Sequence, residues 1–361
     1  MSANFDLSNL ALQAVCPGNE LLYDDKGMPS VMVKIPKMTF ADLGIGTSTA
    51  VHPAFIVNGT EVDAIYISKY QNIVQDGRAY SLPGRDPRHS VTFDTAKGYC
   101  EAKGNGWHIM TRAEWALVAL WCLKNGFLPN GNNNYGRDHK ETVYKAIPMC
   151  REASGKTQRV ATGTGPLTWS HDGTPSGIWD LNGNVWEWVG GLRTVYGEVQ
   201  VLVNNNAADK SHLQTATSAE WKAIDATSGE FITPNGSGTT ENSVKMDFVS
   251  SKCCYTTTPT TISDTSRYSP FGSAYCDSTI SDSAKSVLYA LALLPYDSTA
   301  SKYESDAFYF NNGAAERSFF CGGGWVHGSA AGVFALYGHV SRSSSSIDVG
   351  FRSAYVELPT A

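Results

Sequence analysis

The stretch that decides the fold is Gly177-Ile-Trp-Asp-Leu-Asn-Gly-Asn-Val-Trp-Glu-Trp188. Large aromatic side chains dominate the packing of a core, and a buried indole N–H can find a backbone partner. We therefore expect Trp179, Trp186 and Trp188 to be buried. The central Asn-Gly pair is typical of a tight turn. The stretch thus predicts a turn held within an aromatic core.

Two helices are predicted upstream of this stretch. The first covers Asp94–Lys103, where Asp94 can cap the N-terminus and the apolar residues share one face. The second begins at Thr111, and Glu114 three residues later completes a capping-box pattern. Its interior is apolar nearly all round, which predicts a buried helix, and Gly126 ends it.

The chain has four regions that differ in composition. Residues 1–60 predict short strands and turns, and residues 61–193 hold seven of the nine tryptophans. Residues 194–310 have little pattern and predict a long insertion, with a helix at Ser283–Leu294. Residues 311–361 are again rich in glycine and aromatics. Short helices among short strands favour an α+β fold.

The overall composition excludes several classes of protein. Of the 361 residues, 42% are hydrophobic and 17% are charged, so a substantial core is expected. A net charge of −6 argues against nucleic-acid binding, and no apolar run is long enough for membrane insertion. The first residues lack the pattern of a signal peptide, which predicts cytoplasmic synthesis. The eight cysteines form no C-x-x-C pair, and we expect most to be reduced.

Four sets of motifs, in order, resemble the formylglycine-generating-enzyme (sulfatase-modifying-factor) family, a branch of the C-type lectin fold. They are Ile67–Tyr70 with Val91–Cys100, Gly106–Trp115, Gly177–Trp188, and the closing pair Cys321–Trp325 and Gly350–Ala354. The resemblance implies a C-type lectin-like domain over 61–361, and the composition predicts a β-rich segment over 1–60 before it and the insertion at about 194–310 within it. We also expect Arg352 to form a buried ion pair with Glu187 or Glu114.

The same resemblance implies a structural calcium site. In the family, calcium is bound around this segment by oxygen ligands, and the matching positions are Asn182, Gly183, Val185 and Glu187. Hard oxygen ligands are what calcium requires. The alternative is a tight Asn-Gly turn with a buried Glu salt bridge. No other cofactor is expected.

Enzyme activity is not expected. The family's oxidase activity depends on two nearby cysteines between the closing motifs, but Val326–Val349 contains none, and Cys321 precedes the glycine-rich turn. The chain also lacks the motifs of serine hydrolases, zinc proteases and P-loop enzymes. His108 and His171 are expected to be hydrogen-bonded structural residues.

Residues 320–352 resemble the variable region of proteins diversified by retroelements. Randomising the first two bases of Asn codons never produces Lys, Glu, Gln, Met or Trp. Between Ser318 and Val356 the first four are absent, and the single Trp325 belongs to the family motif. The residues that match the fixed frame are Gly323, Trp325, Gly328, Ala331–Phe334, Leu336, Ser341–Ser343, Ser345 and Gly350–Arg352. The open positions, which we expect to bind ligand, are Gly324, Val326, His327, Ala330, Ala335, Tyr337, His339, Val340, Ser344, Ser346, Ile347 and Asp348.

The resemblance therefore implies a receptor-binding protein of a phage tail tip, carried on the virion. We expect the open positions to share an exposed face, while Trp325, Phe334, Leu336 and Phe351 are buried. The expected partners are a bacterial surface protein or glycan receptor, other phage tail proteins, and a second copy of this chain in a homo-oligomer. The alternatives are an oxidase or another enzyme of the parent family, and a bacterial surface adhesin.

Overall fold

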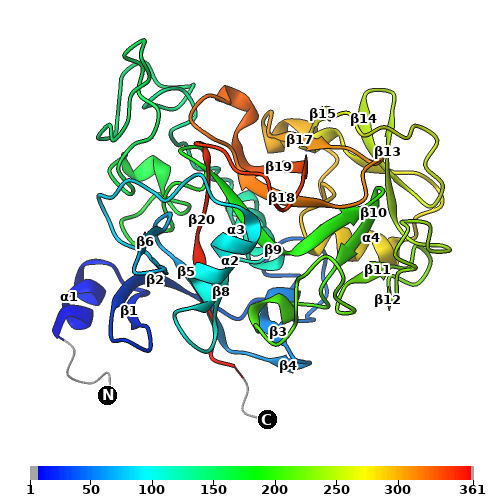
Figure 1. Cartoon of the computed structure of the whole chain (residues 1–361), viewed down its shortest axis with the longest axis horizontal. Coiled ribbons are helices and arrows are strands. Elements are labelled where there is room, and N and C mark those ends of the chain that lie inside the picture. The colour runs from blue at the N-terminus through cyan, green and yellow to red at the C-terminus, as the bar shows by residue number, and fades with distance from the viewer. Residues whose placement is uncertain (1–6, 359–361) are drawn as a thin grey trace.

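The computed structural model describes residues 7–358 and has a mixed α+β architecture (Figure 1). The predicted segments 1–60 and 61–361 also include residues 1–6 and 359–361, which lie outside the described residues. Among the described residues, no helix is long and apolar enough to cross a membrane. The α-helices are α1 (Leu7–Val15), α2 (Phe93–Glu101), α3 (Arg112–Lys124) and α4 (Asp282–Ala290). Short 3-10 helices are η2 (Pro53–Phe55), η3 (Leu167–Trp169), η4 (Asn206–Ala208), η5 (Phe271–Ser273), η6 (Ala300–Tyr303) and η7 (Gly328–Ala330).

A five-stranded sheet joins the N-terminal segment to the C-terminus, in the order β1-β2-β5-β21-β8. Its strands are β1 (Asn19–Tyr23), β2 (Pro29–Pro36), β5 (Ala64–Ser68), β8 (Trp107–Ile109) and β21 (Ser353–Tyr355). Two separate hairpins pair β3 (Ile56–Val57) with β4 (Thr60–Glu61), and β6 (Ile73–Gln75) with β7 (Arg78–Tyr80). The N-terminal strands are thus continuous with the sheet that receives the end of the lectin-like domain.

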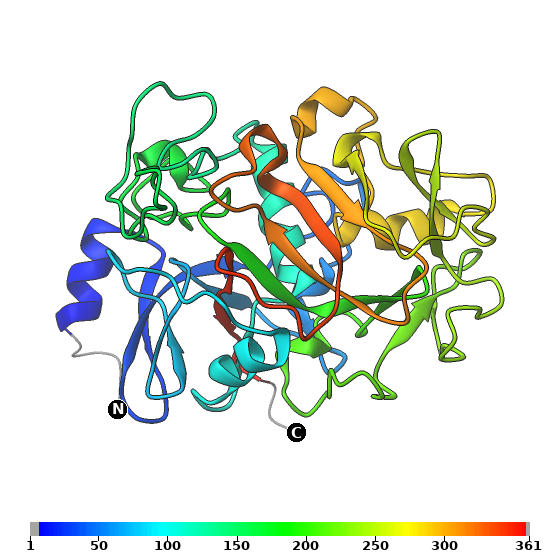
Figure 2. The same cartoon turned by 45° about the horizontal axis from the view of Figure 1, so that its top comes forward.

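A twelve-stranded sheet carries the rest of the chain, with the main order β15-β17-β19-β18-β9-β10-β13-β14-β16. β11 pairs with β10 and β12, and β20 pairs with β9. Its strands are β9 (Trp186–Val195), β10 (Glu198–Val201), β11 (Lys222–Ile224), β12 (Phe231–Ile232), β13 (Lys245–Val249), β14 (Lys252–Thr256), β15 (Arg267–Pro270), β16 (Tyr275–Cys276), β17 (Ala307–Phe310), β18 (Arg317–Gly322), β19 (Gly332–Val340) and β20 (Val349–Phe351). In Figure 2 the C-terminal strands cross the middle of the molecule, between the N-terminal elements and the insertion.

The helices agree with the sequence patterns in part. The capping box at α3 is present, because the Thr111 hydroxyl accepts from the Glu114 amide and the Glu114 carboxylate accepts from the Thr111 amide. The expected cap of α2 was wrong: Thr92 caps this helix, and Asp94 lies in its first turn. The helix of the insertion runs from Asp282 to Ala290 and is shorter than predicted. The sequence patterns did not indicate α1, all of whose side chains are at least partly exposed.

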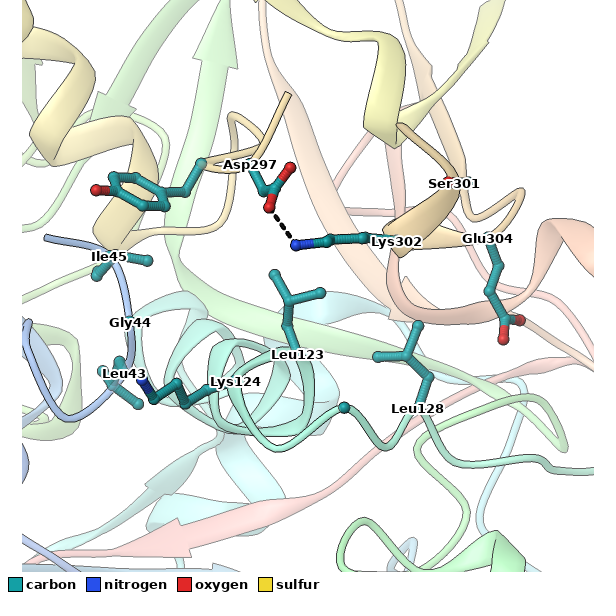
Figure 3. A pocket seen from close by; sticks show the side chains of 12 residues that line it. Leu43, Gly44, Ile45, Leu123, Lys124, Leu128, Asp297, Ser301, Lys302 and Glu304 are labelled. Carbon is teal, nitrogen blue, oxygen red and sulfur yellow. Dashed lines mark hydrogen bonds and ion pairs between the residues drawn. The ribbon is translucent and has the colours of Figure 1, made fainter. Parts of the chain in front are cut away.

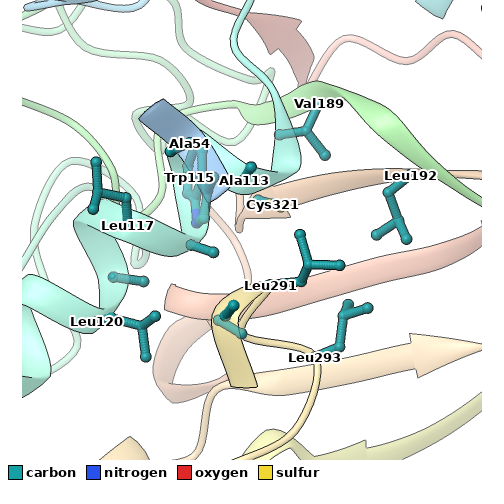
Figure 4. Close-up of a cluster of buried hydrophobic side chains, with 14 of the residues drawn as sticks. Ala54, Ala113, Trp115, Leu117, Leu120, Val189, Leu192, Leu291, Leu293 and Cys321 are labelled. Carbon is teal, nitrogen blue, oxygen red and sulfur yellow. The ribbon is translucent and has the colours of Figure 1, made fainter. Parts of the chain in front are cut away.

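Helix α3 lies at the centre of the main core (Figure 4). Its apolar residues pack with Val189 and Leu192 of β9, and with Leu291 and Leu293 after α4. Buried Arg112 at the start of α3 donates to the carbonyl oxygens of Leu291 (2.8 Å) and Ala292 (2.6 Å). The insertion is therefore tied to the central helix by both apolar packing and hydrogen bonds.

Candidate functional site

In the middle of strand β19, over residues 334–337, fixed and open positions are separated by the direction in which their side chains point. Alternate residues of a strand face opposite sides of the sheet. Phe334 and Leu336 point into the main core and are fully buried. Ala335 and Tyr337 face the other way, toward a second cluster around Trp186 and Trp188. Trp325 and Phe351 are also buried, so the four predicted core residues are confirmed.

Six open positions meet around one hollow of about 210 Å³, which we name the Tyr337 hollow. Tyr337 and Val340 come from β19, His327 precedes η7, and the other three belong to the loop before β20. The hollow is lined by Trp186, Phe320, His327, Tyr337, Val340, Ser344, Ser345, Ser346, Asp348 and Val349. Aromatic rings, serine hydroxyls and one carboxylate thus surround a space large enough for part of a ligand.

The predicted exposure of the open positions was only partly correct. Val326 and Ile347 are exposed, at 46% and 51%. His327, Tyr337, His339, Val340 and Asp348 are half-buried, because they line the hollow or pack on each other's rings, so the expectation that they are mostly exposed was wrong. Ala330 and Ser344 are also half-buried, and Ser346 is exposed.

Two open positions are not on the surface. Ala335 is fully buried in the cluster of Trp186, Trp188 and Phe320, and Gly324 is buried beside Asp348. Ala335 faces the same side of β19 as Tyr337 but lies deeper in the cluster. The expectation that these two residues share the exposed face is therefore corrected: they are part of the support beneath the hollow.

A row of aromatic rings crosses the sheet beneath the hollow. It runs from Tyr268 of β15 through Tyr309 of β17, Tyr337 of β19 and Phe320 of β18 to Trp188 of β9, with centroid separations of 5.0, 5.1, 4.6 and 4.9 Å. The row begins at exposed Tyr268 and ends at buried Trp188. Sequence reasoning missed Tyr268 and Tyr309, because only the long-range pairing of β15, β17 and β19 brings them to Tyr337.

The two histidines of the variable region have environments that favour the neutral imidazole. Burial lowers the pKa of His327, whose Nε2 accepts a hydrogen bond from the Trp186 indole (3.4 Å). Burial, with a smaller contribution from the charge of Arg317, lowers the pKa of His339 to about 4. The hollow is therefore lined by a neutral imidazole, that of His327, and by one carboxylate side chain, that of Asp348.

A loop outside the variable region supports it from the side. The Tyr135 amide donates to the Trp325 carbonyl (2.9 Å), and the Gly328 amide donates to the Asn133 carbonyl (2.9 Å). Arg159, which pairs with Asp86 (2.8 Å), donates from Nη1 to the Ile347 carbonyl (3.4 Å). These contacts hold the start of η7 and the loop before β20 against a framework that does not belong to the open positions.

The Gly177–Trp188 stretch forms the buried polar centre that was predicted. Arg352 donates from Nε and Nη2 to the two carboxylate oxygens of Glu187, at 2.6 and 2.7 Å, and both side chains are fully buried. The partner is thus Glu187, whereas Glu114 contacts His108 (2.8 Å). Arg352 also donates to the carbonyl oxygens of Ser68 and Trp179, so it joins the two sheets.

The four positions expected to bind calcium do not converge on one empty point. The carbonyl oxygens of Gly183 and Val185 and one Glu187 oxygen all accept from the side-chain amide of Gln71. Asn182 Oδ1 instead accepts from the side-chain Nδ2 of Asn133 (3.1 Å), and Asn182 Nδ2 donates to the Pro129 carbonyl. Sequence reasoning missed Gln71, which lies more than a hundred residues earlier in the chain.

The residues considered for oxidase chemistry are deeply buried. Cys321 is inaccessible, its Sγ accepts from Arg112 Nη1 (3.2 Å), and burial raises the pKa of its thiol to about 11. A reactive thiol needs a low pKa and access to substrate. His108 and His171 are hydrogen-bonded within the core, as predicted. Within residues 7–358, no three His, Cys, Asp or Glu side chains are grouped so that they could hold a metal ion.

Larger hollows lie elsewhere on the molecule. One of about 580 Å³ lies between the end of α3, the turn at Leu43–Ile45 and the segment around η6 (Figure 3). Its charged side chains include Asp297 and Lys302, which pair with each other. Another, of about 860 Å³, lies within the insertion. Neither hollow is lined by an open position of the variable region or by an expected calcium ligand.

The fold and the buried Trp-Glu-Trp centre define a C-type lectin-like protein of the formylglycine-generating-enzyme type. The family profile described as "Sulfatase-modifying factor enzyme 1-like domain" matches residues 38–236, more than half of the chain, and the chain belongs to this family. The matched range ends before the variable region. No curated protein sequence gives a significant match.

Several solved structures are similar over nearly the whole chain. PvdO from Pseudomonas aeruginosa is 14% identical, with a TM-score of 0.36 and coverage of 94% of this chain and 98% of its own. Treponema denticola variable protein 1 is 11% identical, with a TM-score of 0.32 and coverage of 94% and 99%. The P3c variant of the Major Tropism Determinant is 11% identical, with a TM-score of 0.30 and coverage of 93% and 71%. Values this low assign no function to the present chain.

Proposed function

We propose that this protein binds a receptor through the Tyr337 hollow and the exposed residues around it, and that it carries out no oxidase chemistry. The observation that carries the proposal is the meeting of six open positions around one hollow. The fixed residues next to them in sequence, such as Phe334 and Leu336, are buried. A rigid scaffold of this kind lets binding residues change without loss of the fold.

The chemistry of the hollow suits adaptable recognition. Tyrosine offers a rigid ring with a polar end, and serine adds hydrogen bonds, as in antibody loops. Tyr337, Ser344 and Ser346 supply these groups, and Asp348 adds a carboxylate. The proposed receptor is a protein or glycan of a bacterial surface, and the proposed setting is a phage tail, in which other tail proteins and further copies of this chain are partners. A bacterial surface adhesin is the alternative setting.

A charged substitution at the edge of the hollow tests the binding role. Labelled protein is incubated with a panel of bacterial strains, and bound protein is measured by flow cytometry. Ser346→Arg should abolish binding, because the exposed Ser346 side chain lies at the hollow and arginine would fill it. Ser211→Arg, at an exposed serine of the insertion, is the matched control. Wild-type binding by Ser346→Arg, or no strain bound by the wild type, would reject the proposal.

Two further measurements test the finer parts of the proposal. Periodate treatment of bound strains removes a glycan receptor, whereas protease treatment removes a protein receptor. For the retroelement, the genome should contain a near-identical copy of the DNA for residues 320–352 that differs only at adenines and lies near a reverse-transcriptase gene. A genome without such a copy would contradict diversification of this chain.

A further inference from the structure

The side-chain amide of Gln71 sits inside a nest of four oxygen atoms. Its Nε2 lies 2.9 Å from the Val185 carbonyl, 3.0 Å from a Glu187 carboxylate oxygen, 3.2 Å from the Asp180 carbonyl and 3.3 Å from the Gly183 carbonyl. Gln71 is fully buried. An amide NH₂ carries two hydrogens, and shared hydrogen bonds allow both to serve four acceptors. Three of these oxygens belong to residues that the family resemblance assigned to calcium.

The orientation of this amide is set by its other end. Gln71 Oε1 accepts a hydrogen bond from Asn184 Nδ2 (2.9 Å). Asn184 in turn is held because its Oδ1 accepts from the Val160 amide (2.9 Å). If the Gln71 amide were turned around, its NH₂ group would face the NH₂ group of Asn184, so that two donors would meet. Its oxygen would then face the four oxygens of the nest, with no hydrogen to bond them. The amino end therefore faces the four oxygens.

The charge in the nest is already balanced. Glu187 is the one carboxylate among the four acceptors, and both of its oxygens accept from the Arg352 guanidinium. A calcium ion would need six to eight oxygen ligands at about 2.3–2.6 Å, usually with more than one carboxylate. Here it would also lie beside the Arg352 cation. The residues present do not fit calcium.

We propose that the Gln71 amide takes the place of the calcium ion that the family resemblance implies, so that this chain folds and remains stable without calcium. Each oxygen that would bind the cation is satisfied instead by an N–H donor from the same chain. The neutral amide does what the metal would do: it joins the turn at Asp180–Val185 to the segment after β5. The Tyr337 hollow, whose wall includes Trp186, is then held in place independently of calcium.

The wild-type protein gives the first test. Its melting temperature should be the same, within error, in 5 mM EDTA and in 5 mM calcium chloride, concentrations on the order of those that saturate weak calcium sites. Calorimetric titration should show no calcium uptake. Gln71→Met keeps the length of the side chain but removes both donors. This variant should melt more than about 5 °C lower, because buried acceptors lose their partners, and calcium should not restore it.

Replacing the amide with a carboxylate should create the missing site. Gln71→Glu places an anion among the four oxygens, so its melting temperature should fall in EDTA and rise again on addition of calcium. Gln214→Glu is the matched control, since Gln214 is also buried but its side-chain amide accepts from the Gly191 amide and donates to the Ala207 carbonyl rather than to the four oxygens. It should lose stability without calcium rescue. The proposal is overturned if EDTA lowers the melting temperature of the wild type, or if Gln71→Met melts like the wild type.

Discussion

At the scale of single residues, the buried Arg352–Glu187 pair is a polar link between the two sheets. Its carboxylate and guanidinium are completely enclosed, and removing one partner leaves a buried charge unpaired. The cost of such a change is roughly 3–5 kcal/mol, a large share of the stability of a domain. Arg352→Ala should therefore lower the melting temperature markedly or abolish soluble expression. An unchanged melt would show that the pair does not hold the sheets together.

Asp180 is a residue that should reduce stability at neutral pH. Burial raises the pKa of its carboxyl group to about 6, and its Oδ1 has no hydrogen-bond partner within residues 7–358. The folded protein therefore holds this proton more tightly than the unfolded chain does. The resulting stability is complete below the ordinary pKa of 3.8 and is lost as the pH rises through 6.

Removing the charge should restore that stability. Asp180→Asn keeps the acceptor for the Gly163 amide and suits the left-handed backbone at this position, where φ is 62°. The variant should gain roughly 2–3 kcal/mol over the wild type at pH 8 and much less at pH 5. Denaturant melts at the two pH values measure the difference. An equal effect at both would show that the charge of Asp180 is not responsible.

At the scale of elements, β19 carries both scaffold and binding positions, and the two differ in what they tolerate. Ala335 lies against Trp186, Trp188 and Phe320, so a larger side chain has no space there. Ala335→Tyr should destabilise by about 1–3 kcal/mol or more, whereas Val326→Tyr, on the exposed turn before η7, should stay within about 0.5 kcal/mol of the wild type. Thermal melts of the two variants measure this difference, and equal melting temperatures would contradict the burial of Ala335.

The sequence predicted the elements whose signals are local. The capping box at Thr111 and Glu114 and the apolar run after it were enough to place α3. Likewise, the Trp-Glu-Trp string and Arg352 predicted a buried ion pair. The cap of α2 was misplaced by two residues because Thr92 and Asp94 are both good capping residues. Only the hydrogen bond from Thr95 to the Thr92 side chain distinguishes them.

The site could be predicted only in part, because its other contributors come from distant parts of the chain. Tyr309 reaches Tyr337 through parallel pairing of β17 with β19, and Gln71 reaches Glu187 across more than a hundred residues. Neither contact leaves a periodic pattern in the sequence. This packing also explains why Tyr337 is half-buried. Tyr337→Ala should therefore cost more stability than the same substitution of an exposed tyrosine.

At the scale of the whole molecule, two buried histidines should make stability fall in acid. Burial lowers the pKa values of His52 and His171 to about 4. Each uses Nδ1 to accept a backbone amide, so neither can be protonated in place without losing that bond. Their folded pKa values lie below the ordinary 6.5, so the stability they supply is present above pH 6.5 and is lost as the pH falls toward 4.

The expected loss is a large share of the stability of a domain. Each histidine contributes roughly 3 kcal/mol across that window, partly offset by Asp180, whose contribution has the opposite sign. The melting temperature should therefore drop between pH 6.5 and 4, and the drop should be smaller in His171→Gln, whose side-chain oxygen can still accept from Ile178. A pH profile of His171→Gln parallel to that of the wild type would contradict this account.

The central claim is that a fixed scaffold carries a binding surface whose residues can change, and a pair of displayed libraries tests it most directly. The first randomises the open positions of the hollow, which are His327, Tyr337, Val340, Ser344, Ser346 and Asp348. The second randomises as many fixed positions, Gly323, Trp325, Phe334, Leu336, Gly350 and Phe351, with the same codons. The measurement is the fraction of members that resist protease. Most of the first library should resist and few of the second should, whereas equal fractions would contradict the division into scaffold and binding surface.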